Sequence, residues 1–210
     1  MIKAILFDLD GTLIDSTDLI LFSFNHVMKE YLNLDVPEQE IRSLFGKPLY
    51  SQMEIYGGKE RARELVEKYR EHNLISHKDH LKEIPGVKET LEGLKKKGYA
   101  LGIVTSKQED SARLGMQICE IEDFFDIFVF SNTVTIHKPE PEPVLYALRK
   151  LGLKPEEAVY VGDSTYDIIC GQRAGVETVG VGYTPVGREQ LKATNPDHWI
   201  EKIEELLEIY

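Results

Sequence analysis

Five short apolar runs, separated by longer segments with helical patterns, constrain the fold of this chain more than any other feature. Polar and apolar residues do not alternate within these runs, which is typical of strands covered on both faces. A repeated strand–helix–strand order favours a parallel sheet with helices packed on both sides, so we predict an α/β fold. The predicted strands cover residues 2–7, 99–105, 127–130, 158–161 and 178–181.

The predicted helices have recognisable ends. Glycine follows the helical segments 86–97 and 143–151, as is common at helix C-termini. Ser164 is suited to cap a helix that stops at Gly175. A last helix is predicted at residues 203–209, where apolar residues recur at helical spacing.

Residues 15–80 break the strand–helix rhythm. Apolar residues recur at helical spacing through this segment, and no part of it has a strand pattern. Both of its ends are polar or contain proline, as linkers often do. We therefore predict an α/β core of residues 1–14 and 81–210, with an α-helical bundle of residues 15–80 inserted after the first strand.

Composition excludes several classes of function. The chain has 210 residues and a formal net charge of −11 at pH 7, which is a poor match for nucleic acid or an anionic membrane surface. No run approaches the roughly 20 apolar residues of a membrane span, and the first apolar run turns acidic at Asp8, too early for a signal peptide. Cys119 and Cys170 form no CxxC pair and no zinc spacing. We expect a reduced, cytoplasmic protein, a monomer or homodimer, with a small-molecule partner rather than nucleic acid or a membrane.

Polar clusters follow four of the predicted strands. Because the carboxyl ends of parallel strands lie along one edge of a sheet, and ligands bind at that edge, one crevice could gather all four clusters. They are DLDGT at residues 8–12, Thr105-Ser106-Lys107, Lys138-Pro139, and GDSTYD at residues 162–167.

The residue types in these clusters point to phosphoryl transfer. Four carboxylates at close quarters would repel one another unless a hard cation lay between them, and Mg²⁺ suits oxygen ligands that share a phosphate. Thr105 and Ser106 supply hydrogen-bond donors, and Lys138 supplies a positive charge. A nucleophile, a metal, a cation and such donors are what phosphoryl transfer requires. The four carboxylates are Asp8, Asp10, Asp163 and Asp167.

Taken together, the motifs resemble those of the haloacid dehalogenase (HAD) superfamily of phosphohydrolases. The matching segments are DLDGT, VTS at residues 104–106, Lys138 and GDSTYD, in that order. The helical insert resembles the small cap domain of that superfamily, which implies a Rossmann-like parallel core with an α-helical cap. The segments LIDSTDLILFSF, KYREHNLISH, GYALGIVTSK and HKPEPEPV are most similar to PpaX-type pyrophosphatases and phosphoglycolate phosphatases. This resemblance implies a Mg²⁺-dependent enzyme that hydrolyses a small phosphorylated metabolite, either pyrophosphate or phosphoglycolate.

The resemblance also implies a role for each motif residue. Asp8 would be the nucleophile that forms an aspartyl-phosphate, and Asp10 would protonate the leaving group and then activate water. Both carboxylates can face one site only if the first strand continues through them. Lys138 would neutralise charge on Asp8 and the phosphate. The other implied contacts are Thr105, Ser106 and Gly11 for the phosphoryl group, and Asp8, Asp10 (through its backbone carbonyl), Asp163 and Asp167 for Mg²⁺.

Each motif also has a purely structural interpretation. The DLDGT segment could be an Asx-rich turn, Thr105 and Ser106 could cap a helix, and Lys138 could be solvated. GDSTYD could begin a capped helix, although two aspartates four residues apart on one helical face favour a metal site. The four motifs together favour the functional interpretation. His77 and His80 could bind a metal, but we expect solvated histidines on a polar segment.

Substrate choice is expected from the helical insert, because the core motifs handle a phosphoryl group that every substrate shares. Residues 45–49 (FGKPL) are either a helix connection or a loop that contacts the substrate, through Gly46 and Lys47. Arg70 is a further candidate contact for an anion.

Two other functions compete with a phosphatase. A sugar phosphomutase of the same fold would return the phosphoryl group to a sugar. A non-catalytic phospho-receiver module also places acidic residues and a lysine on a parallel sheet, but it lacks the Asp8-x-Asp10 pair and needs no helical insert. A haloacid dehalogenase proper is disfavoured, because it does not use Asp10 and Mg²⁺ in this way.

Overall fold

The computed structural model describes residues 1–183 and 187–210, which form two compact units. The first combines Met1–Asp15 with Glu83–Tyr210, and we call it the α/β unit. The second, Ser16–Lys82, is mainly helical, and we call it the helical unit.

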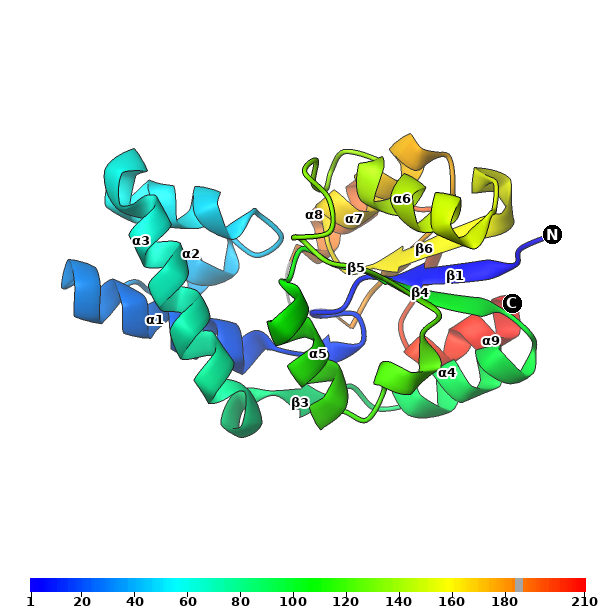
Figure 1. Ribbon diagram of the computed structural model, residues 1–210, viewed down its shortest axis with the longest axis horizontal. Helices are drawn as coiled ribbons and strands as arrows, with labels where there is room; N and C mark the ends of the chain where they lie inside the picture. Colours follow the sequence, from blue (N-terminus) through cyan, green and yellow to red (C-terminus); the bar gives the residue numbers. More distant parts are fainter. Residues whose placement is uncertain (184–186) are drawn as a thin grey trace. The chain divides into compact units, whose positions relative to one another are not determined.

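Six parallel strands form the sheet of the α/β unit, in the order β5-β4-β1-β6-β7-β8. Figure 1 labels β5, β4, β1 and β6 of this sheet. This sheet confirms the predicted fold class, a Rossmann-like parallel core with an α-helical insertion. The last strand was not predicted, because its three residues, HWI, are too few to show a pattern. The strands are β1 Ala4–Phe7, β4 Ala100–Val104, β5 Ile127–Val129, β6 Ala158–Gly162, β7 Glu177–Val181 and β8 His198–Ile200, and β2 Ile14–Asp15 and β3 Lys82–Glu83 form a separate two-stranded sheet.

Helices cover both faces of the large sheet, which explains the uniformly apolar strands. Helices α6 and α7 lie on one face, and α4 and α9 lie on the other (Figure 1). Ala4 and Leu6 of β1 pack with Val144 of α6 in one buried cluster. Ile5 and Phe7, which are also fully buried, point to the opposite face because side chains alternate along a strand. These helices are α4 Val87–Lys96, α6 Glu142–Leu151, α7 Thr165–Ala174 and α9 Leu206–Ile209.

Several helix ends follow from the local sequence as predicted. Ser164 caps α7 by accepting a hydrogen bond from the backbone N–H of Asp167, and Gly175 ends that helix in the left-handed conformation at φ 76°. Gly152 ends α6 in the same way at φ 68°. The helix predicted at residues 203–209 is divided instead, into a 3₁₀ turn and the short α9. The remaining elements of the unit are α5 Glu109–Ile118, α8 Arg188–Ala193, and the 3₁₀ turns η1 Glu122–Phe124, η2 Pro155–Glu157 and η3 Ile203–Glu205.

The helical unit contains α1 Thr17–Leu32, α2 Glu38–Arg42 and α3 Leu49–His80. Helix α3 is kinked at Gly58, whose φ of 65° and ψ of 174° are not helical. The apolar faces of these helices meet in a buried core of Leu21, Phe24, Val27, Met28, Ile41, Leu44, Met53, Ala62, Leu65, Val66 and Tyr69.

His77 corrects one expectation, because it is fully buried rather than solvated. Its ring nitrogen Nδ1 lies 2.6 Å from the backbone oxygen of Asn73, one helical turn earlier in α3. That carbonyl satisfies the ring, so the imidazole is accommodated inside the helical unit. His80 is half-buried and stacks on Phe22, with ring centroids 4.1 Å apart.

Candidate active site at the carboxyl ends of the strands

The strand register brings the motif residues of the α/β unit to one edge of the sheet. Phe7 of β1 pairs with Ile103 of β4 and with Val161 of β6, so the three strands end at nearly the same level. The chain crosses from β1 to one side for β4 and to the other side for β6, and α/β sheets bind ligands at such a reversal. The first motif residues past these strand ends are Asp8, Thr105 and Asp163.

Lys138 is buried at the centre of this edge, with 7% of its surface exposed. Its Nζ lies 2.8 Å from Oδ1 of Asp8 and 2.5 Å from Oδ1 of Asp167, and it donates to the Tyr160 hydroxyl at 3.0 Å. Burial lowers the pKa of Lys138, but the charges of Asp167 and Asp8 outweigh burial and hold the pKa above its ordinary value. Lys138 is therefore a permanent cation between two carboxylates.

Tyr160 belongs to this arrangement, although no sequence pattern pointed to it. Its hydroxyl donates to the backbone oxygen of Val104 at 2.7 Å and lies 3.1 Å from Oδ1 of Asp167. Oδ2 of Asp167 accepts from the backbone N–H of Ser164 at 3.0 Å and from its hydroxyl at 2.5 Å. Because protein donors occupy both oxygens of Asp167, this carboxylate is oriented mainly to hold Lys138 and the start of α7.

Asp10 is paired with a lysine of its own. Nζ of Lys107 lies 2.9 Å from Oδ1 of Asp10, and the two side chains are 10% and 25% exposed. The strand does not continue through Asp10 as the sequence argument required, because β1 ends at Phe7 and Asp10 forms only an isolated bridge to Ile14. Burial is the main cause that raises the pKa of Asp8, and the charge of Asp10 adds a smaller contribution in the same direction.

Gly11 is required by the close approach of Asp163. A Cβ atom added at Gly11 would lie 2.2 Å from Oδ2 of Asp163, and the φ of Gly11 is +81°. Asp163 also belongs to the cluster that could hold a metal ion, in which Asp8, Asp163 and Asp167 each offer an oxygen within 4.8 Å of the others. Asp10 is not part of this carboxylate cluster; its side chain pairs with Lys107 instead.

The charges of the site fit a divalent cation. Four carboxylates accompany the two ammonium groups of Lys107 and Lys138, which leaves two negative charges in excess. Burial raises the pKa of Asp8 to about 7, against the lowering effect of Lys138. A cation beside Asp8 and Asp163 would favour the ionised form of Asp8, and carboxylate oxygens are the ligands that Mg²⁺ prefers.

Thr105 and Ser106 lie at the same edge but differ in burial. Thr105 is 6% exposed, and its Oγ1 accepts a hydrogen bond from the backbone N–H of Lys107 at 3.2 Å. This contact lies within the turn after β4. The N-cap of α5 is Gln108, so neither Thr105 nor Ser106 caps that helix, contrary to the structural interpretation of the motif. Ser106 is exposed, in the bend that follows β4.

The specificity candidates lie in the helical unit. Gly46 adopts φ 83°, Lys47 is exposed, and the backbone oxygen of Lys47 accepts from Nε2 of Gln52 at 2.8 Å. Arg70 is exposed on α3. Their contribution to substrate choice stays a prediction.

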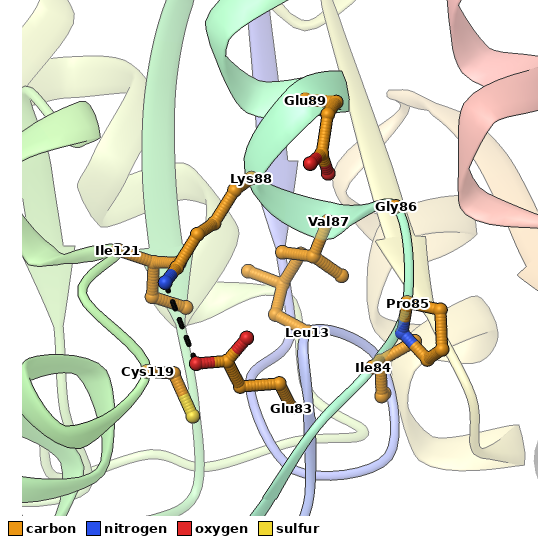
Figure 2. A pocket seen from close by; sticks show the side chains of 10 residues that line it. All are labelled: Leu13, Glu83, Ile84, Pro85, Gly86, Val87, Lys88, Glu89, Cys119 and Ile121. Carbon is orange, nitrogen blue, oxygen red and sulfur yellow. Dashed lines mark hydrogen bonds and ion pairs between the residues drawn. The ribbon is translucent and has the colours of Figure 1, made fainter.

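A pocket of about 190 Å³ at the start of α4 contains none of the motif residues (Figure 2). Lys88 and Glu83 form an ion pair of 3.4 Å on its wall, and Cys119 lies beside them. Burial raises the pKa of the Cys119 thiol to about 11, so the thiol is protonated at neutral pH and has little reactivity. Cys119 therefore gives this pocket no reactive thiolate.

Comparison with known proteins identifies the family of the chain. The sequence matches the model of the family described as "Haloacid dehalogenase-like hydrolase" over residues 5–181. The chain therefore belongs to the haloacid dehalogenase-like hydrolases. Among the described residues, no helix has the length and apolar character needed to cross a membrane.

Individual relatives are similar over nearly their whole length. The chain is 46% identical over 209 residues to "Putative pyrophosphatase PpaX" of Clostridium perfringens, covering 100% of this chain and 97% of the relative. It is 41% identical over 210 residues to "Pyrophosphatase PpaX" of Bacillus velezensis, with 99% and 96% covered. A solved structure of a predicted phosphoglycolate phosphatase from Haemophilus somnus superimposes with a TM-score of 0.89 at 27% identity, covering 99% of this chain and 97% of the other.

Proposed function

We propose that this hydrolase is a Mg²⁺-dependent phosphohydrolase that forms an aspartyl-phosphate on Asp8 and acts on a small phosphorylated metabolite. The observation that carries the proposal is the position of Asp8 at a strand end, bonded through one oxygen to the buried cation Lys138 and clustered with Asp163. A carboxylate held in this way has its second oxygen available for attack on phosphorus.

The reaction would proceed in two displacements. In the first, a carboxylate oxygen of Asp8 forms a bond to phosphorus while the bond from phosphorus to the leaving oxygen breaks, and Asp10 gives its proton to that oxygen. In the second, Asp10 takes a proton from water, whose oxygen attacks the same phosphorus and releases phosphate from Asp8. Lys138 stays protonated throughout and offsets the charge that accumulates on the phosphoryl oxygens.

The metal-binding residues would be Asp8 and Asp163, with the backbone carbonyl of Asp10, and Asp167 in support through Lys138 and Ser164. When bound, Mg²⁺ would supply positive charge to the phosphoryl oxygens and to Asp8. Thr105 and Ser106 would then donate to the phosphoryl group. The backbone N–H of Gly11, the third donor suggested by the sequence, already donates to the backbone oxygen of Ile14 at 2.8 Å.

Inorganic pyrophosphate is the substrate we favour, and phosphoglycolate is the second choice. The support for pyrophosphate is the name that relatives at 46% and 41% identity carry over nearly the full chain. The support for phosphoglycolate is the name given to a solved structural neighbour at 27% identity. We also propose that the helical unit acts as the cap that contributes to this choice, in a cytoplasmic enzyme.

A steady-state screen tests the proposal. Purified protein is assayed with pyrophosphate, phosphoglycolate, glucose 1-phosphate and an aryl phosphate, in Mg²⁺, in Ca²⁺ and after chelation. We expect the highest kcat/KM with pyrophosphate in Mg²⁺, poor support by Ca²⁺, and loss of activity with chelator. Undiminished rates after exhaustive chelation would contradict the metal, and transfer of the phosphoryl group to glucose 1-phosphate would indicate a phosphomutase instead.

Asp8→Asn is the matching variant for the nucleophile. An amide does not attack phosphorus, so turnover should fall by at least about 10³-fold on every substrate while the thermal melt is preserved. Asp35→Asn is the control, because Asp35 is a highly exposed aspartate of the helical unit. Substantial activity in Asp8→Asn with a normal melt would remove Asp8 from the proposed role.

A further inference from the structure

We propose that Lys107 binds the negative charge of the leaving group and thereby selects substrates whose leaving group is itself an anion, such as the phosphate released from pyrophosphate. This inference rests on the proposed function, and it assigns specificity to a residue of the α/β unit. The roles proposed for the other motif residues and for the helical unit do not include this one.

The position of Lys107 relative to Asp10 is the first support. Nζ of Lys107 lies 2.9 Å from Oδ1 of Asp10. In the proposed reaction Asp10 delivers its proton to the leaving oxygen, so the atoms within hydrogen-bond reach of Asp10 lie beside the leaving group. An ammonium at that point meets the part of the substrate that departs rather than the phosphoryl group that is transferred.

The different partners and burial of the two lysines are the second support. Nζ of Lys138 is bonded to Asp8, Asp167 and Tyr160, and Lys138 is buried on the side of the nucleophile. The partner of Lys107 is Asp10, whose side chain is 25% exposed, whereas the two carboxylates bound to Lys138 are more buried. A substrate anion can therefore approach Lys107 while Lys138 stays engaged with Asp8.

The backbone of Lys107 is fixed at both ends, which limits the entropy lost when it binds an anion. Its N–H donates to Oγ1 of Thr105 at 3.2 Å, and its carbonyl accepts from the N–H of Ser131 at 3.0 Å. Helix α5 begins two residues further on, so the positive end of its dipole adjoins the same turn. Glu109, the nearest acidic residue along the chain, pairs with Arg113, and the carboxylate that Lys107 contacts is that of Asp10.

The charge balance of the reaction explains the selectivity. Cleavage of pyrophosphate transfers one phosphoryl group to Asp8 and places the electron pair of the broken bond on the bridging oxygen of the departing phosphate. That phosphate already carries negative charge, which grows until the proton from Asp10 arrives. A fixed ammonium beside the departing phosphate therefore stabilises this transition state more than the bound substrate. An aryl leaving group carries no such fixed anion and gains less.

Lys107→Met tests the inference, because methionine keeps much of the side-chain length and removes the charge. We expect kcat/KM for pyrophosphate to fall at least about tenfold further than kcat/KM for an aryl phosphate, with the larger part of the difference in kcat. Lys107→Arg, which restores a cation, should return the ratio of the two values to within about threefold of the wild-type ratio. Lys96→Met is the matched control, since it also removes a lysine from an ion pair. Nζ of Lys96 lies 2.8 Å from Oε1 of Glu92 on α4, and the Lys96 side chain is 72% exposed.

Equal losses on the two substrates in Lys107→Met would overturn the inference, because Lys107 would then act only by positioning Asp10. No loss on either substrate would overturn it as well. The inhibition constant of imidodiphosphate, a pyrophosphate analogue with a P–N–P bridge, gives an independent binding measurement and should rise in Lys107→Met. These outcomes are separate from failure of the proposed function, which would show as absence of Mg²⁺-dependent hydrolysis by the wild-type protein on any substrate.

Discussion

The two lysine–aspartate groups of the site have different surroundings. The inner group consists of Lys138 with Asp8 and Asp167, whose side chains are 6%, 10% and 1% exposed. The outer pair is Lys107 with Asp10, at 10% and 25% exposure. The inner group has two more hydrogen bonds, because Tyr160 accepts from Lys138 and the backbone N–H of Ser164 donates to Asp167. The outer pair faces more solvent.

This difference matches the chemistry that each group would perform. The transferred phosphoryl group is the same in every substrate, so the residues around it gain from a fixed, buried arrangement with no reorganisation during the reaction. The leaving group differs between substrates and must enter and depart, so its contacts belong at the more exposed rim. In the proposed mechanism, burial would therefore separate the residues that transfer the phosphoryl group from those that select the substrate.

Asp10→Asn changes the outer pair and should have the largest effect on the rate of turnover. It should also separate the two half-reactions. Loss of a general acid–base typically costs about 10²- to 10⁴-fold, and here the water-attack step should slow by that amount. A p-nitrophenyl phosphate leaves without needing a proton, so the variant should release one equivalent of nitrophenolate rapidly and then stall. Stopped-flow absorbance measures this burst.

Pyrophosphate should give no such burst in Asp10→Asn, because its departing oxygen needs the proton. A burst with both substrates, or with neither, would contradict the assignment of Asp10 to the leaving-group side. Asp110→Asn, at an exposed aspartate of α5, is the control.

Lys138→Met should lower the free energy of unfolding more than a matching change in the outer pair. Removing Lys138 leaves Asp8 and Asp167 buried without their shared cation, which should cost about 3 kcal/mol of unfolding free energy. Lys107→Met should cost less than Lys138→Met, because the side chain of Asp10 keeps 25% of its surface exposed to water. Urea unfolding in the absence of Mg²⁺ measures both values, and a larger loss for Lys107→Met would reverse the comparison.

Lys47→Ala should have the smallest effect and tests the helical unit. Lys47 is exposed next to the left-handed Gly46, at a point suited to contact an anion. We expect a loss of roughly tenfold in kcat/KM for pyrophosphate, about 1.4 kcal/mol, and a smaller loss for an aryl phosphate. Lys59→Ala, at an exposed lysine on α3, is the control, and unchanged kinetics for Lys47→Ala would make Arg70 the next residue to test.

The sequence was sufficient to predict the fold class because its signals are local. Uniformly apolar runs marked five of the six strands in the large sheet, and Ser164 and Gly175 marked the two ends of α7. The three-residue β8 had no such signal, since its pairing with β7 depends on contacts distant in the chain. The same motifs located Asp8, Lys138 and Asp163, which the strand register brings to one edge.

The residues that the sequence did not identify depend on long-range geometry. Tyr160 lies within an apolar run and looks like a core residue, and only the position of Lys138, 22 residues away, gives its hydroxyl a polar environment. Lys107 was part of a recognised cluster, but its partner Asp10 is 97 residues distant. His77 looked solvated because its neighbours in sequence are polar, whereas the carbonyl of Asn73 makes its burial possible.

The central claim is that the phosphoryl group passes through Asp8, the nucleophile of the inner group. The most direct measurement uses Asp10→Asn, whose slow second step should accumulate the intermediate. The protein is mixed with Mg²⁺ and p-nitrophenyl phosphate, quenched in acid, digested and examined by mass spectrometry. We predict one phosphoryl group on the peptide that contains Asp8, lost on treatment with hydroxylamine and missing when Asp8 is also replaced by Asn. An unmodified Asp8 peptide despite rapid nitrophenolate release, or a phosphoryl group on another residue, would contradict the claim.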